Sequence, residues 1–142
     1  MEDSVSFLIA QVCKAHRNTA NALLQERLDL YAGQEMFLNF LAQHDGASQS
    51  ELAQSLCVEA PTITRMVQRL GQAGLVERST DPNDARVTRL HVTPKGRDVL
   101  GQMDEVWQEI EARTMADFNT DECAMLRRML TRVRDNLAHN HP

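Results

Sequence analysis

The chain has 142 residues and a formal net charge of −5, from 15 Lys and Arg against 20 Asp and Glu. Its 42% hydrophobic and 25% charged residues are typical of a globular domain and exclude a disordered, collagen-like or mucin-like chain. No apolar run approaches the ~20 residues that a membrane span needs, and the acidic start lacks the positive region of a signal peptide. We therefore expect a cytoplasmic protein with no membrane contact.

The first sixty residues predict three helices, over residues 5–30, 34–44 and 48–56. Apolar residues recur at helical spacing in the first two, and Gly33 separates them. Ser48, followed three residues later by Glu51, forms a capping box that opens the third helix, because each side chain accepts a hydrogen bond from the other residue's backbone amide.

The next segment changes from a helical to an alternating pattern. A helix is predicted from Pro61 to Ala73, with Gly74 as its left-handed cap, and its apolar residues recur at i, i+3, i+4 and i+7. Two short strands are predicted over residues 75–79 and 87–92, joined by a turn-rich tip that ends in an arginine.

Two more helices follow the strands. Thr93 caps a helix that begins at Pro94 and reaches about Phe118. Asn119 and Glu122 form a second capping box and open a last helix that ends near residue 138. The predicted fold class is mainly α with a small β-hairpin wing, a winged helix-turn-helix flanked by N- and C-terminal helices.

Positive charge is concentrated between residues 61 and 97, which hold seven basic and three acidic residues. Residues 1–60 hold three basic and eight acidic residues, and residues 98–142 hold five and nine. A basic segment neutralises phosphates, whereas acidic flanks repel them. The chain is therefore acidic overall but has a centre suited to nucleic acid.

A short helix, a turn, a helix with a polar-basic face and a basic-tipped hairpin predict a winged helix-turn-helix that binds double-stranded DNA. The second helix fits a major groove ~12 Å wide, a hairpin arginine fits the minor groove, and the start of the short helix can bind phosphate. Each feature alone also fits a solvated surface, so their order carries the prediction. The candidate DNA-binding residues are Ser48, Gln49, Ser50, Pro61, Thr62, Thr64, Arg65, Gln68, Arg69, Arg86 and Arg89.

Between Arg27 and Leu100 the chain resembles the multiple antibiotic resistance regulator (MarR) family of bacterial winged-helix transcription factors. The matching stretches are SELAQSL, APTITRMVQRLGQAGLVERS, DPNDAR and LHVTPKGRDVL. DPNDARVTRLHVTPKG is the most specific, because it joins the wing turn, a strand and a helix start in the family's order. Ala85 departs from the pattern where a second arginine is common, and Ala60-Pro61 replaces a frequent Asp/Lys-Ser pair.

The resemblance implies a homodimer, bound to a palindromic operator, in which the first and last helices of the two subunits intertwine. It implies that Thr62, Thr64, Arg65 and Gln68 face bases, that Arg86 enters the minor groove, and that Asp84 braces Arg86 by an ion pair. The expected organisation is one domain over 1–142, with a DNA-binding lobe at 32–100 and dimerisation helices at 1–31 and 101–142. Apolar stripes on the terminal helices favour the dimer independently, although they could also pack on their own domain.

The resemblance also implies a repressor that a small phenolic or lipophilic ligand releases from DNA. Candidate ligand-binding residues are His16, Tyr31, Met36, Phe40, Met103 and Trp107. Aromatic and methionine residues at helical spacing are more often core residues, and that alternative is favoured for this group.

Regulation by oxidation of a thiol is a second possibility. Cys13 lies in an apolar stripe beside basic residues, and Cys57 is expected to be a small buried packing residue. Cys123 is the better candidate, because it lies in the first turn of the last helix, where the helix dipole lowers a thiol pKa. The sequence has no C-x-x-C pair, cofactor motif or catalytic triad, so we predict no metal, no cofactor and no enzymatic activity. The alternative from another functional class is a winged-helix module that binds proteins and does not bind DNA.

Overall fold

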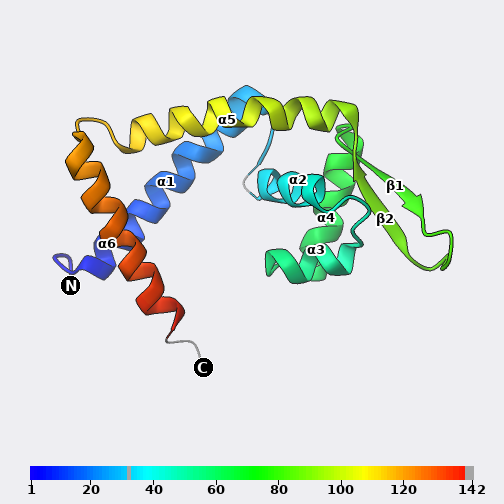
Figure 1. Cartoon of the computed structure of the whole chain (residues 1–142), viewed down its shortest axis with the longest axis horizontal. Helices are drawn as coiled ribbons and strands as arrows, with labels where there is room; N and C mark the ends of the chain where they lie inside the picture. Colours follow the sequence, from blue (N-terminus) through cyan, green and yellow to red (C-terminus); the bar gives the residue numbers. More distant parts are fainter. Residues whose placement is uncertain (32, 140–142) are drawn as a thin grey trace. The chain divides into compact units, whose positions relative to one another are not determined.

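The computed structural model describes residues 1–31 and 33–139. The predicted lobe boundary at residue 32 and the last three residues of the predicted domain, 140–142, lie outside these residues. The described chain folds in the order α1 (Val5–Leu28), α2 (Gln34–Gln43), α3 (Gln49–Leu56), α4 (Ala60–Gln72), β1 (Val76–Thr80), β2 (Thr88–Val92), α5 (Pro94–Thr114) and α6 (Thr120–Ala138) (Figure 1). This is the mainly helical, hairpin-winged fold class that the sequence predicts.

Side-chain caps begin the helices where the sequence places them. The Ser48 hydroxyl accepts a hydrogen bond from the Glu51 amide at 3.2 Å, and the Glu51 carboxylate accepts one from the Ser48 amide at 2.9 Å. Asn119 and Glu122 form the same reciprocal pair at the start of α6. Because these caps use only residues three apart, they are readable from the sequence alone.

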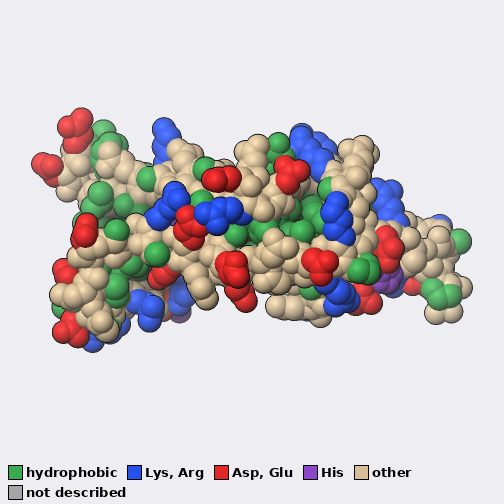
Figure 2. All heavy atoms as spheres, turned by 90° about the horizontal axis from the view of Figure 1, so that it is seen from above, with side chains coloured by type: hydrophobic (Ala, Val, Ile, Leu, Met, Phe, Trp, Pro, Cys, Tyr) green, Lys and Arg blue, Asp and Glu red, His purple; other side chains and the backbone are tan. Residues whose placement is uncertain are grey.

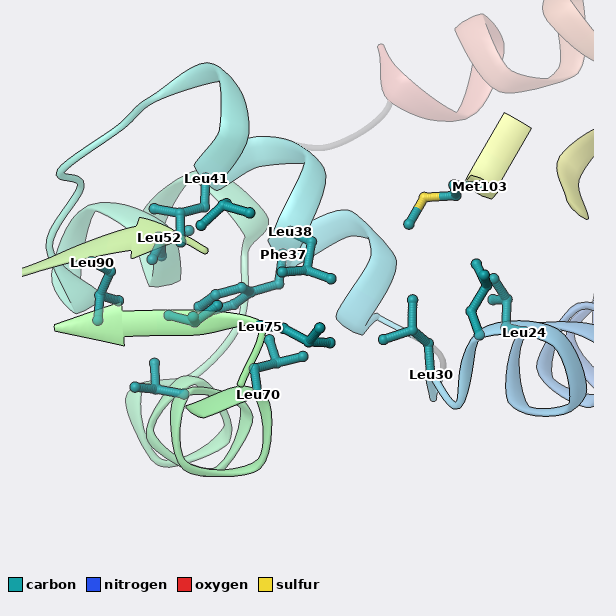
Figure 3. Packing of buried hydrophobic residues seen from close by; sticks show 14 of the residues in the cluster. Leu24, Leu30, Phe37, Leu38, Leu41, Leu52, Leu70, Leu75, Leu90 and Met103 are labelled. Atoms are coloured by element: carbon teal, nitrogen blue, oxygen red, sulfur yellow. The ribbon is translucent and has the colours of Figure 1, made fainter. Parts of the chain in front are cut away.

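Contacts divide the chain into two compact units, Met1–Ile110 and Glu111–Pro142. The core lies in the first unit, around the fully buried Phe37 of α2. Figure 3 shows Leu41 and Leu52 on one side of the Phe37 ring and Leu70 on the other. This single cluster therefore fixes α3 and α4 against α2, which is the geometry that a helix-turn-helix requires.

Several helix ends differ from the prediction, among them the ends of α2 at Gln43 and of α4 at Gln72, which are each one residue early. Helix α1 ends at Leu28 because Asp29 adopts a left-handed conformation (φ 53°), which Asp tolerates better than most residues. Helix α4 begins at Ala60, so Pro61 is its second residue; the missing amide still costs nothing, since the first four amides of a helix have no intrahelical acceptor. Helix α5 ends at Thr114 and does not reach Phe118, and Asp117 turns the chain with φ 67°.

The two strands pair antiparallel, with Ser79 opposite Arg89. Leu90 and Val92 face the core and alternate with more exposed residues, as predicted. The connection between α2 and α3 runs beside β2, because the Gly46 amide donates to the Leu90 carbonyl at 2.9 Å and the Leu90 amide donates to the Ala47 carbonyl at 3.0 Å. The base of the wing is therefore tied to the segment that leads into α3.

On the surface seen in Figure 2, acidic and basic side chains are interspersed. No helix within the described residues combines the length and the apolar composition that crossing a bilayer requires.

Candidate nucleic-acid interface

Helix α4 has one buried and one exposed face. Its Ile63, Val67 and Leu70 are buried in the core. The opposite face carries the exposed side chains of Thr64, Arg65, Gln68 and Arg69, with Pro61 exposed and Thr62 half-buried at the start of the helix. Helix α3 contacts α4, so the two form a helix-turn-helix whose second helix presents hydroxyl, amide and guanidinium groups.

Thr64 joins the two helices of this motif. Its hydroxyl lies 3.3 Å from the side-chain oxygen of Gln49 and 3.1 Å from the carbonyl of Ala60, and it donates to one of them at a time. The structure thus brings together two predicted DNA-binding residues that are fifteen positions apart. A hydrogen bond to Gln49 would compete with a hydrogen bond from Thr64 to a base.

The start of α3 is partly occupied by its own cap. Ser48 and Gln49 are half-buried and Ser50 is exposed. The hydroxyl and amide of Ser48 both belong to the capping box. Helix geometry leaves the amides of Gln49 and Ser50 without an intrahelical acceptor, so these two groups are suited to a phosphate.

Arg86 stands at the tip of the wing with 92% of its side chain exposed. Its Nε lies 3.2 Å from Oδ1 of Asp84, which also accepts the Arg86 amide at 3.1 Å. Asp81 shapes the same turn, because its Oδ1 accepts the amides of Asn83 at 2.7 Å and Asp84 at 3.3 Å. The Asn83 amide, and after it the Arg89 guanidinium, lower the pKa of Asp81 below its ordinary value.

Arg89 has different surroundings, although the sequence groups it with Arg86. Only 34% of its side chain is exposed, and its Nε and Nη2 donate to Oδ2 of Asp81 at 3.1 and 2.9 Å. Its Nη1 donates to the Gly46 carbonyl at 3.3 Å and lies 3.7 Å from the Glu51 carboxylate. The guanidinium is directed at the protein, with three hydrogen bonds and one longer ion pair made within the chain.

Sequence reasoning overlooked a second contact at the base of the wing. His91 Nδ1 lies 2.9 Å from Oδ1 of Asp45, and its Nε2 lies 2.7 Å from the Ser79 hydroxyl. The three residues are far apart in the chain, and only the alternation of His91 with buried Leu90 and Val92 indicates its outward face. Arg78, exposed on β1, was also overlooked; it lines a cavity with Gln68 and Glu77.

The six candidate ligand-binding residues lie in different environments. Met103 is buried in the core, and Phe40 is half-buried with its ring stacked on His44 at 4.1 Å. The other four are exposed: His16, Tyr31, Met36 and Trp107. Tyr31 alone among the six lines the cavities described here, together with Gln34 and Arg69, whose guanidinium carbon lies 6.0 Å from the Tyr31 ring.

The cysteines also occupy different environments. Cys57 is exposed, so its expected burial is wrong: it is the left-handed C-cap of α3 (φ 53°), and its side chain projects from the turn. Cys13 is exposed and Cys123 is half-buried. Within the described residues, no three His, Cys, Asp or Glu side chains are grouped to hold a metal ion.

Comparisons with known proteins agree with this geometry. Residues 30–88 match the model of the MarR family. The chain is 29% identical over 136 residues to the HTH-type transcriptional repressor IacR of Pseudomonas putida, covering 96% of this chain and 81% of that protein. It is 26% identical over 133 residues to the HTH-type transcriptional regulator BilQ of Clostridioides difficile, covering 94% and 89%.

Solved structures of MarR are similar to the chain over most of its length. Wild-type MarR from E. coli in its apo form has a TM-score of 0.79 and 28% identity, over 92% of this chain and 96% of that one. A mutant MarR from E. coli complexed with operator DNA has a TM-score of 0.75 and 28% identity, over 91% and 92%. The resemblance therefore extends from the DNA-binding lobe to the flanking helices.

Proposed function

We propose that this chain is a transcriptional regulator of the MarR family, a homodimeric repressor that a small phenolic or lipophilic ligand releases from a palindromic operator. MarR-family members are transcription regulators and not enzymes. The observation that carries this proposal is the division of α4 into a buried apolar face and an exposed face of threonine, glutamine and arginine. A repressor of this kind acts where its operator is, in the cytoplasm.

We assign base contacts to the middle of α4 and backbone contacts to its surroundings. Thr62, Thr64, Arg65 and Gln68 would face the major groove, where arginine pairs with guanine and threonine contacts the thymine methyl group. Arg86 would enter the minor groove, and the amides of Gln49 and Ser50 would hold a phosphate. Support comes from the operator complex of the similar E. coli MarR mutant.

The dimer is proposed from apolar surface on the terminal helices. Val5, Leu8 and Val12 of α1 are each more than half exposed. Helix α6 has no buried residue along its described length, and Met129 and Leu137 are more than half exposed. Apolar surface of this extent on two long helices favours a second copy as its cover, and two copies match a palindrome. The predicted segments 1–31 and 101–142 remain our assignment of the dimerisation helices.

The effector is proposed to bind beside Tyr31. This residue lines cavities that also include Gln34, at the start of α2, and Arg69, on α4. A phenolic ligand can stack on the Tyr31 ring and accept a hydrogen bond from Arg69. Because Arg69 belongs to α4, occupancy of this place would shift the helix that reads DNA.

The test is a fluorescence-anisotropy titration with DNA from the protein's own promoter region at 50 and 200 mM salt. We expect binding that weakens steeply with salt, because phosphate contacts release counterions. Arg65→Ala should reduce the affinity, whereas Arg97→Ala, which removes the same charge from an exposed position on α5, should leave it nearly unchanged. Absence of binding at low salt would contradict the proposal, and a salt slope of zero would favour a protein-interaction module.

A further inference from the structure

The wing is connected to the rest of the DNA-binding lobe by a series of polar contacts. The Gly46 carbonyl, in the connection between α2 and α3, accepts Nη1 of Arg89 at 3.3 Å. Arg89 holds Oδ2 of Asp81 with two further nitrogens. Oδ1 of Asp81 accepts the amide of Asp84, and Asp84 contacts Arg86. An unbroken series of contacts therefore runs from the segment that leads into α3 to the wing-tip arginine.

A second contact lies nearer the base of the wing. His91 of β2 contacts Asp45, in the same connection between α2 and α3, and Ser79 of β1. Its ring therefore links both strands of the wing to the segment that leads into α3. Ser79 lines none of the cavities described above, so the Ser-His-Asp order of these contacts does not make a substrate site.

We propose that Asp45, Ser79, Asp81, Arg89 and His91 form a wing clamp that fixes the direction of the wing and thereby sets DNA affinity without touching DNA. This inference rests on the proposed DNA-binding function, and it reassigns Arg89 from a DNA contact to a positioning residue. The physical reason is that Arg89 would have to leave Asp81 and the Gly46 carbonyl before its guanidinium could reach a phosphate. A wing that moves freely would also lose conformational entropy each time it docks on DNA.

Asp81→Asn distinguishes a DNA-contact role of Arg89 from a positioning role, because the two roles predict opposite changes in DNA affinity. The asparagine oxygen can still accept the amides of Asn83 and Asp84, but its NH2 group cannot accept a hydrogen bond from Arg89. If Arg89 were a DNA contact, removing this negative charge and releasing the arginine would tighten binding. The wing clamp predicts weaker binding, by at least about threefold to tenfold, the usual range for one lost hydrogen bond, because Oδ2 of Asp81 accepts two from Arg89.

Arg89→Lys provides a second, independent measurement. Lysine keeps the positive charge but not the planar fork of donors that holds Asp81. The wing clamp predicts that Arg89→Lys loses as much affinity as Arg89→Ala, with an unchanged salt slope in both variants. A direct phosphate contact predicts that lysine binds like the parent and that alanine lowers the slope by about one. The double variant D81N/R89K should lose no more than either single variant.

Two controls keep these outcomes interpretable. Asp98→Asn removes an exposed negative charge from α5, outside the clamp, and should leave the affinity unchanged or slightly tighter. Far-UV circular dichroism and the melting temperature establish that each variant is folded. Failure of the parent to bind DNA would overturn the proposed function itself. If the parent binds DNA but Asp81→Asn binds more tightly, or Arg89→Lys binds like the parent, only the wing clamp is overturned.

Discussion

Gly96→Ala should destabilise the base of the wing. A methyl group added at this residue of α5 would lie 2.4 Å from the Leu75 carbonyl oxygen and 2.7 Å from a methyl group of Val92, whereas ordinary contact begins at 3.4 Å. The Leu75 carbonyl cannot rotate away, because it accepts the Thr93 amide at 3.0 Å. Helix α5 would therefore have to move by about 1 Å. Overpacking costs about 1–3 kcal/mol, and the better helix propensity of alanine returns about 1 kcal/mol.

From the upper part of that range we expect Gly96→Ala to lower the free energy of unfolding by about 2 kcal/mol, or the melting temperature by about 6–8 °C. Gly71→Ala of α4 is the control, since a methyl group there would meet only the Val76 carbonyl oxygen at 3.9 Å, an ordinary contact, and the residue lies outside the proposed dimerisation helices. It should gain up to about 1 kcal/mol from helix propensity alone. Thermal melts at one fixed protein concentration measure both variants, because the melting temperature of the proposed dimer would depend on concentration. Equal stabilisation of both variants would refute the reasoning.

Three further predictions concern DNA binding, the pH dependence of stability and helix capping. Arg86→Ala should weaken binding to operator and random DNA alike, whereas Arg65→Ala should also change the preferred bases, as competition titrations would measure. Burial raises the pKa of Glu35 in the folded state above its unfolded value of about 4.3. The protonated carboxyl therefore contributes its full stability below the unfolded pKa. That contribution is lost as pH rises through the folded pKa. Glu35→Gln should therefore be more stable than the parent at pH 7, and denaturant melts should show this difference shrinking towards pH 4. Ser48→Ala should cost about 1 kcal/mol through loss of the α3 cap, and Ser50→Ala, on the exposed side of the same turn, should cost less.

Most of the architecture follows from signals that span a few residues. The capping boxes of α3 and α6 and the glycine after α4 act within one helical turn, so their residue types are sufficient to place the helix ends. The buried face of α4 follows from the same periodicity, because Ile63, Val67 and Leu70 can share one face only in a helix. The exposed face of α4 is its complement and could be predicted equally well.

Sequence reasoning is insufficient where residue types reveal neither a local backbone turn nor a distant partner. Cys57 looked like a packing residue by its type, yet the left-handed turn that ends α3 directs its side chain outward. Helix α5 ends at Thr114, and no proline or glycine beside that residue indicates the end of the helix. Arg89 contacts Gly46, 43 positions earlier, and that contact cannot be inferred from the strand around it.

Ion pairs within the wing reduce the positive charge that the centre of the chain offers to DNA. Residues 61–97 have a net charge of +4, but Arg89 and Arg86 already lie against Asp81 and Asp84. In the described part of the chain, Arg65 forms no ion pair. Arg86 pairs with Asp84, but most of the Arg86 side chain stays exposed. Phosphate neutralisation should therefore depend more on α4 than on the tip of the wing, where the only arginine is Arg86 and the wing clamp fixes its direction. A salt slope that falls more for Arg89→Ala than for Arg65→Ala would contradict this division.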